Sequence, residues 1–271
     1  MVKVDVCIET FFTQFSYEER IKKVAAAGYR AIEFWFHDYH FDGKNLIPKE
    51  KNIKSIAKVI DDLGLEVSDM VVNSPEGNIG GSLVKPEDKN TYLSRLKKVI
   101  ELAHLLNCKK LITCTGNSVE GKSKKEQVES IVDTLTEASE VVEKENITLI
   151  LEPLNSLVDH PGYFLDSFKE AATIVRRINH PNIRLLYDIY HMQIMEGNIL
   201  STIKQNIDII GHFHSAGVPG RHELSRGELN YPFIYKEISE MGYNGYFGLE
   251  YWPSMDSDTS LKETRDLLGV Q

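Results

Sequence analysis

Cysteine is scarce in this chain, and long apolar runs are missing. The three cysteines, Cys7, Cys108 and Cys114, are odd in number and irregularly spaced, which argues against a disulfide framework and for reduced thiols. No apolar run approaches the ~20 residues that span a bilayer, and the amino terminus lacks the order of a secretory signal. These absences predict a soluble, cytoplasmic protein that has no membrane partner.

Basic residues are also in deficit, with 31 lysines and arginines against 40 aspartates and glutamates, for a net charge of −9. A nucleic-acid backbone would meet a repulsive field, so we expect no nucleic-acid partner. Linkers, low-complexity tracts and shifts in composition are absent as well. The 271 residues, 42% of them apolar, are enough for one sizeable core, which predicts a single domain over residues 1–271.

What the sequence does contain is one unit repeated eight times: a short apolar run, a polar turn and a longer amphipathic stretch. The predicted strands are residues 4–9, 31–36, 66–73, 110–116, 147–154, 183–190, 207–217 and 246–252. Eight alternations in roughly 250 residues are typical of an α/β fold of the (β/α)8 TIM barrel type. An open doubly wound sheet usually has fewer strands and a marked switch point.

The predicted helices between these strands have recognisable starts and stops. Ser16 is followed three residues later by Glu19, which is a capping-box pattern, and Pro86 opens a helical stretch that runs to about Leu106. Gly28 and Gly64 follow apolar helical stretches and precede strands, where a left-handed helix-ending residue is favoured.

Candidate catalytic groups lie where strands end, because the carboxyl ends of TIM-barrel strands carry the active site. Glu152 ends ITLILE, Asp188 ends IRLLYD, Glu250 ends YFGLE, and His212 and His214 close IDIIGHFH. Residues two apart on a strand share a face, so the two histidines should point the same way, and Glu152 should top the inward row of its strand.

Carboxylates that converge without a counter-charge repel one another, and a divalent cation removes that cost. Glu152, Asp188, His214 and Glu250 therefore form a candidate metal site, whose oxygen-rich donor set suits Mg²⁺, Mn²⁺ or Co²⁺. A single acidic residue at a strand end is more often a helix cap or a salt-bridge partner. Four consecutive strands that each end in a metal-competent residue are much harder to obtain by chance.

Several other residues are weaker candidates. Glu33 and His37 lie at the end of the second predicted strand and either reach the pocket or stay solvated, whereas Trp35 is a core or pocket-wall aromatic, with the core favoured. His104 lies within an amphipathic helix and is expected at the surface. The glycine-rich segment at residues 73–81 matches no phosphate loop and is interpreted as a mobile loop over the open face.

At these residues the chain resembles the hydroxypyruvate isomerase family, within the xylose isomerase-like TIM barrels that also include the ketose 3-epimerases. The resemblance runs through nearly the whole chain. Its most specific segments are LEPLN at 151–155, YDIYHMQIMEGN at 187–198, GVPGRHE at 217–223, GELNYPFIYKEI at 227–238 and GYFGLEYWP at 245–253.

The resemblance implies that Glu152, Asp188, His214 and Glu250 hold a metal and take part in proton transfer. It also implies that His191 and Arg221 contact the substrate. Two positions depart from the hydroxypyruvate isomerase pattern. His214 stands where these enzymes commonly have glutamine and the ketose 3-epimerases have histidine. The segment NIGGSLV stands in place of an arginine-containing loop after the third strand.

The expected activity is a metal-dependent isomerisation of a small keto acid or sugar. Moving a carbonyl along the carbon chain requires removal of a C–H proton and stabilisation of the resulting enediolate, and Glu152 and Glu250 are given the base and acid roles. Three alternatives remain: a ketose 3-epimerase, an abasic-site DNA nuclease, against which the acidic balance argues, and a barrel that only binds a sugar. The sequence leaves open whether the chain forms a homo-oligomer.

Overall fold

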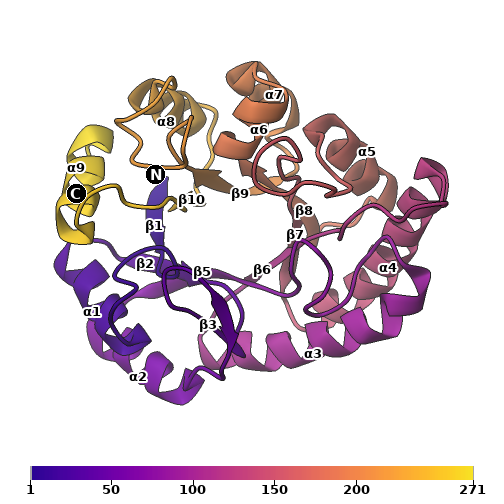
Figure 1. Cartoon of the computed structure of the whole chain (residues 1–271), viewed down its shortest axis with the longest axis horizontal. Helices are drawn as coiled ribbons and strands as arrows, with labels where there is room; N and C mark the ends of the chain where they lie inside the picture. The colour runs from indigo at the N-terminus through magenta and orange to yellow at the C-terminus, as the bar shows by residue number, and fades with distance from the viewer. Residues whose placement is uncertain (1, 271) are drawn as a thin grey trace.

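A computed structural model describes residues 2–270, and its centre is a closed barrel of parallel strands in the ring order β1-β10-β9-β8-β7-β6-β5-β2. Figure 1 looks down this barrel, with the helices arranged around the strands. The strands of the barrel are β1 (Lys3–Cys7), β2 (Ala31–Phe34), β5 (Glu66–Val71), β6 (Lys110–Thr113), β7 (Thr148–Leu151), β8 (Ile183–Asp188), β9 (Ile210–Ser215) and β10 (Tyr246–Leu249). All eight coincide with predicted strands, which confirms the (β/α)8 barrel.

Helices follow the barrel strands and cover them on the outside (Figure 1). They are α1 (Tyr17–Ala26), α2 (Ile53–Leu63), the 3-10 helix η1 (Pro86–Asp88), α3 (Lys89–Leu105), α4 (Lys124–Lys144), α5 (Phe168–Ile178), α6 (Ile189–Met195), α7 (Ile199–Asn206), α8 (Tyr231–Glu240) and α9 (Ser257–Leu268). Within residues 2–270, no helix combines the length and the apolar character needed to cross a membrane.

The predicted helix boundaries are present. The Ser16 side chain accepts a hydrogen bond from the Glu19 amide at the start of α1, and Gly64 ends α2 in the left-handed conformation at φ 63°. Such a residue satisfies the last carbonyls of the helix and turns the chain toward the next strand. The local sequence thus determines where each helix stops and lets the following strand enter the barrel.

Alternation along the strands separates two apolar cores. Leu149 and Leu151 of β7 pack outward in the large core formed with the helices, whereas Ile150 points inward and belongs to a smaller cluster in the barrel. Glu152 follows this strand directly, so it stands at the rim above Ile150, as the alternation predicted. The three cysteines are all buried and unpaired.

One element was not predicted. The strands β3 (Tyr39–Phe41) and β4 (Leu46–Pro48) pair antiparallel in a hairpin between β2 and α2. Each has three residues, which is too short to produce a pattern of alternating apolar positions. The hairpin places Leu46 on the wall of the pocket described next.

Candidate metal and substrate site

Four side chains converge at the carboxyl ends of neighbouring strands. Glu152 follows β7, Asp188 ends β8, His214 lies near the end of β9 and Glu250 follows β10. One ligand atom from each lies within 4.8 Å of the others, and all four residues are buried. The structure therefore brings together the four residues that the strand ends singled out.

Asp188 is held in place by the helix that it begins. As the N-cap of α6, its Oδ1 accepts hydrogen bonds from the backbone amides of Tyr190 (2.7 Å) and His191 (3.1 Å). Its Oδ2 lies 3.4 Å from Nε2 of His191 and 4.0 Å from the Arg221 guanidinium. One carboxylate oxygen is thus used by the backbone, and the other is available to the site.

Glu250 is fixed by two donors from distant parts of the chain. The Trp35 indole donates to its Oε1 at 2.9 Å, and the Arg221 guanidinium donates to its Oε2 at 2.5 Å. Arg221 lies in the loop after β9 with φ 57°, and its amide donates to the carbonyl of Gly217. Among residues 2–270, the acidic side chains within 4.0 Å of the Arg221 guanidinium are those of Glu250 and Asp188, so the arginine lies in the site and not at the surface.

His214 connects the site to the barrel interior. Its Nδ1 lies 3.5 Å from Oε1 of Glu152 and 3.3 Å from Oε2 of Glu250, while its Nε2 lies 3.1 Å from Oε2 of Glu33. Burial opposes a charge on the ring, but Glu33 and Glu250 outweigh burial and raise the pKa of His214 above its usual value, so an ion that binds Nδ1 displaces a proton while Nε2–H stays bonded to Glu33. A metal-binding histidine is commonly oriented by such a carboxylate.

The four residues suit a divalent cation by their donor chemistry and by their unsatisfied atoms. Within residues 2–270, Oε1 of Glu152 and Nδ1 of His214 are buried and have no hydrogen-bond partner. Buried polar groups are normally paired, and a lone pair that faces other lone pairs is satisfied by a cation. Three carboxylates and one imidazole are ligands for Mg²⁺, Mn²⁺ or Co²⁺, and zinc also accepts them.

The electrostatics of the carboxyl groups without an ion are uneven. Burial raises the pKa of Asp188 to about 7, although the Arg221 guanidinium opposes this shift. Burial raises the pKa of Glu152 as well. Burial would also raise the pKa of Glu250, but Arg221 and His214 outweigh it and hold that pKa below its usual value. A protonated Asp188 competes with a cation, so metal affinity should fall toward acidic pH.

His191 faces the pocket with a defined tautomer. Its Nδ1 lies 2.6 Å from the side-chain nitrogen of Asn155 and accepts from the Asn155 backbone amide at 3.3 Å. Because Nδ1 accepts, the ring proton is on Nε2, the atom that points toward Asp188. Burial lowers the pKa of His191 well below its usual value. A neutral imidazole therefore presents one N–H donor to a ligand.

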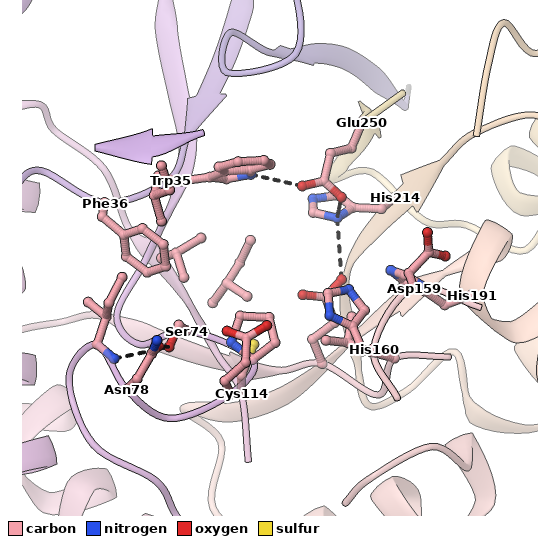
Figure 2. Close-up of a pocket in the computed structure, with 18 of the residues that line it drawn as sticks. Trp35, Phe36, Ser74, Asn78, Cys114, Asp159, His160, His191, His214 and Glu250 are labelled. Carbon is pink, nitrogen blue, oxygen red and sulfur yellow. Dashed lines mark hydrogen bonds and ion pairs between the residues drawn. The ribbon is translucent and has the colours of Figure 1, made fainter. Parts of the chain in front are cut away.

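The pocket has a volume of about 510 Å³. Figure 2 shows Trp35 and Phe36 on one side, with His160 and His191 on the other. Nine apolar residues and Cys114 form much of the wall, and within residues 2–270 Arg221 is the only lysine or arginine that lines it. Of the two interpretations of Trp35, the structure shows the pocket wall, although the core was favoured: the side chain lines the pocket and packs against the small interior cluster.

The weaker candidates have separate outcomes. Glu33 neither lines the pocket nor stays solvated. It is buried beneath the pocket and contacts His214. His37 is largely buried and is not part of the described pocket wall. His104 is exposed, as predicted, and its ring lies 2.9 Å from Glu145. The segment 73–81 supplies Ser74, Pro75, Glu76, Asn78 and Ile79 to the wall.

Comparison with known proteins gives the family. Residues 21–269 match the family model described as xylose isomerase-like TIM barrel. The chain belongs to this family. The match begins within α1 and ends just after α9, so it covers seven of the eight barrel strands, all but β1, and all the residues of the pocket wall.

Relatives within the xylose isomerase-like family include isomerases. The hydroxypyruvate isomerase of Escherichia coli K12 is 29% identical over 266 residues, which are 97% of this chain and 98% of that protein. The 2-oxo-tetronate isomerase of Cupriavidus necator is 26% identical over 266 residues, or 97% of each chain. These relatives identify the chain as an isomerase.

Among solved structures, one titled AP endonuclease, family 2 from Brucella melitensis has a TM-score of 0.87 and 27% identity, and the match covers 98% of this chain and 99% of that one. An L-ribulose 3-epimerase has a TM-score of 0.82 at 21% identity, over 100% of this chain and 94% of that one, which shows the shared fold alone.

Proposed function

We propose that the protein is a metal-dependent isomerase of small hydroxy-carbonyl compounds, with 2-keto acids such as hydroxypyruvate as the preferred class. The observation that carries this proposal is the convergence of four donors beside one arginine and one neutral histidine. The donors would hold a divalent ion through Glu152, Asp188, His214 and Glu250. When bound, such an ion supplies an electrophile that stabilises negative charge on the substrate's oxygens.

The two glutamates are suited to move the proton. Before an ion binds, burial raises the pKa of Glu152, whereas Arg221 and His214 outweigh burial and hold the pKa of Glu250 below its usual value. Two carboxyl groups whose pKa values are pushed apart can act as a base and an acid in the same site.

Arg221 and His191 would orient the substrate. The Nε and Nη2 atoms of Arg221 donate to the carbonyl and to Oε2 of Glu250. No hydrogen bond from Nη1 is found within residues 2–270. A substrate carboxylate can therefore bind the outer edge of the guanidinium through two parallel hydrogen bonds. The Nε2–H of His191 can donate to a hydroxyl or carbonyl oxygen, because Asn155 occupies Nδ1.

A ketose 3-epimerase is the second candidate, and the observation that favours it is His214. The notable difference between the two reactions is the fate of the proton, which moves between two carbons in an isomerase and returns to the opposite face of one carbon in an epimerase. The buried site and the net charge of −9 give a nucleic acid no basic surface, so we do not propose an abasic-site nuclease.

The test is a proton-exchange assay in heavy water. The purified protein is incubated with C3 to C6 keto acids and neutral ketoses, and both product and deuterium uptake are followed by NMR. The proposal predicts isomerised keto acid with deuterium at the carbon that receives the proton. Epimerised ketose without isomerised keto acid would favour the epimerase, and no exchange with any compound would contradict both.

A matched pair of variants identifies the proton carrier. Glu152→Gln should abolish exchange because an amide cannot transfer the proton, whereas Glu140→Gln, an exposed carboxylate on α4, should leave exchange unchanged. Full exchange by Glu152→Gln at saturating metal would remove Glu152 from this role.

A further inference from the structure

A second group of buried polar side chains lies inside the barrel, beneath the pocket. Asp5 on β1, Glu33 on β2, Asp69 on β5 and His212 on β9 point into the barrel interior, and none is more than 2% exposed. Ligand atoms of Glu33, Asp69, His212 and His214 lie within 4.8 Å of one another. The proposed reaction assigns no role to Asp5, Asp69 or His212.

These side chains are mostly unpartnered. Within residues 2–270, both carboxylate oxygens of Asp69 and both ring nitrogens of His212 are buried without a hydrogen bond, as are Oδ1 of Asp5 and Oε1 of Glu33. A buried polar group without a partner destabilises the fold, and a charged one does so more strongly. Such a concentration of unpaired donors and acceptors at the centre of a barrel indicates a ligand that binds them.

The spacing of the atoms fits a shared ion better than a direct hydrogen bond. Nε2 of His212 lies 3.4 Å from Oε2 of Glu33 and 3.4 Å from Oδ2 of Asp69. A direct N–H···O bond is about 2.7–3.2 Å long. Two ligands that each lie about 2.0–2.1 Å from a tetrahedral metal ion are about 3.3–3.4 Å apart, which agrees with both separations.

The neighbouring strand leaves room for this group. Gly248 on β10 is paired in register with both Asp5 and His214. A Cβ atom there would lie 2.8 Å from Cδ2 of His214, 3.1 Å from Nε2 of His212 and 3.2 Å from Oε2 of Glu33. Any side chain larger than hydrogen would fill the space at which the nitrogen and the carboxylate point.

We propose that Glu33, Asp69 and His212 bind a second divalent transition-metal ion inside the barrel, with Asp5 as the adjacent carboxylate. Two or three carboxylates and an imidazole are ligands that Zn²⁺ and Co²⁺ accept. Nε2 of His212 lies 3.8 Å from Oδ2 of Asp5, so this carboxylate can complete or support the coordination. Glu33 also contacts His214, so the interior ion lies directly behind a ligand of the pocket ion.

The test counts metal ions per chain and does not depend on the reaction. The protein is unfolded with a chelator, refolded with Zn²⁺ or Co²⁺, freed of excess ion and analysed by elemental mass spectrometry. We expect two ions in the wild type, one in Asp69→Asn and one in Asp188→Asn, which loses only the pocket ion. The control Asp61→Asn, an exposed carboxylate on α2, should keep two.

One ion in the wild type that Asp188→Asn removes would overturn the proposal, and so would two ions that both remain in Asp69→Asn. If Asp69→Asn does not fold, Asp188→Asn still tests the proposal. This variant should take up one Co²⁺ and show the visible absorption of a tetrahedral nitrogen and oxygen site. Its melting temperature should be higher with the ion than without it. No Co²⁺ uptake by that folded variant would refute the interior site. Since activity is not measured, failure of the proposed reaction would leave this result intact.

Discussion

Replacement of Arg221 by lysine tests how the pocket recognises its substrate. Arg221 donates to Glu250 at 2.5 Å and lies 4.0 Å from Asp188, and its side chain is only 12% exposed. Lysine keeps the positive charge but lacks the planar fork that binds a carboxylate through two parallel hydrogen bonds. The variant should therefore lose at least one charge-assisted hydrogen bond to a keto acid.

The size of the effect follows from that lost bond. A hydrogen bond to a charged group contributes about 1.5–3 kcal/mol, which corresponds to a loss of roughly 10- to 150-fold in kcat/KM. Part of any loss will come from a less well held Glu250, and that part affects all substrates alike. The informative quantity is the ratio of kcat/KM for a keto acid to kcat/KM for a neutral ketose, which should fall about tenfold or more.

The assay compares both substrate classes in the wild type, in Arg221→Lys and in Arg226→Lys. Arg226 is exposed and lies 4.0 Å from Glu223, so its replacement should leave the ratio unchanged. An equal fractional loss for keto acid and ketose in Arg221→Lys would refute the carboxylate contact. Arg221 would then act only by holding Glu250, and the epimerase would become the better assignment.

Three further predictions concern other parts of the barrel. Asn155→Leu removes the group that fixes the His191 tautomer, so KM should rise about tenfold with little change in kcat. Steady-state kinetics measure both constants, and a fall in kcat alone would contradict this role. Glu250→Gln should abolish turnover and also lower the melting temperature, because Arg221 loses the buried carboxylate with which it pairs, and kinetics with thermal unfolding check both effects. Burial raises the pKa of Asp5 to about 7. In the metal-free protein the protonated Asp5 therefore contributes its full stability below pH ~4, and this contribution is lost as the pH rises to about 7. Asp5→Asn should flatten the pH dependence of the unfolding free energy, and an unchanged slope would exclude this origin.

The sequence was sufficient for the barrel and for the four donors because both follow from strand patterns. Each strand is an apolar run long enough to recognise, and Glu152, Asp188, His214 and Glu250 lie at or next to a strand end. The rule that the carboxyl ends of TIM-barrel strands converge then places them together. Whether they hold an ion remains a prediction.

The remaining parts of the pocket depend on loops or on combinations of strands. Asn155 and His160 lie in the segment between β7 and α5, whose path no periodicity determines. Trp35 could have been placed from its alternation with Glu33, but its aromatic character suggested the core. The interior group was not predicted because Asp5, Asp69 and His212 lie within apolar runs, and their proximity depends on the register between strands.

Metal-dependent proton exchange is the most direct test of the account. Protein stripped with a chelator is incubated with hydroxypyruvate in heavy water, and deuterium uptake is measured by NMR before and after addition of Mg²⁺, Mn²⁺ or Co²⁺. We predict no uptake by the stripped protein, recovery with at least one ion, and no recovery in Asp188→Asn at the same ion concentration. Undiminished uptake by fully stripped wild-type protein would contradict the central claim that Glu152, Asp188, His214 and Glu250 act through a bound ion.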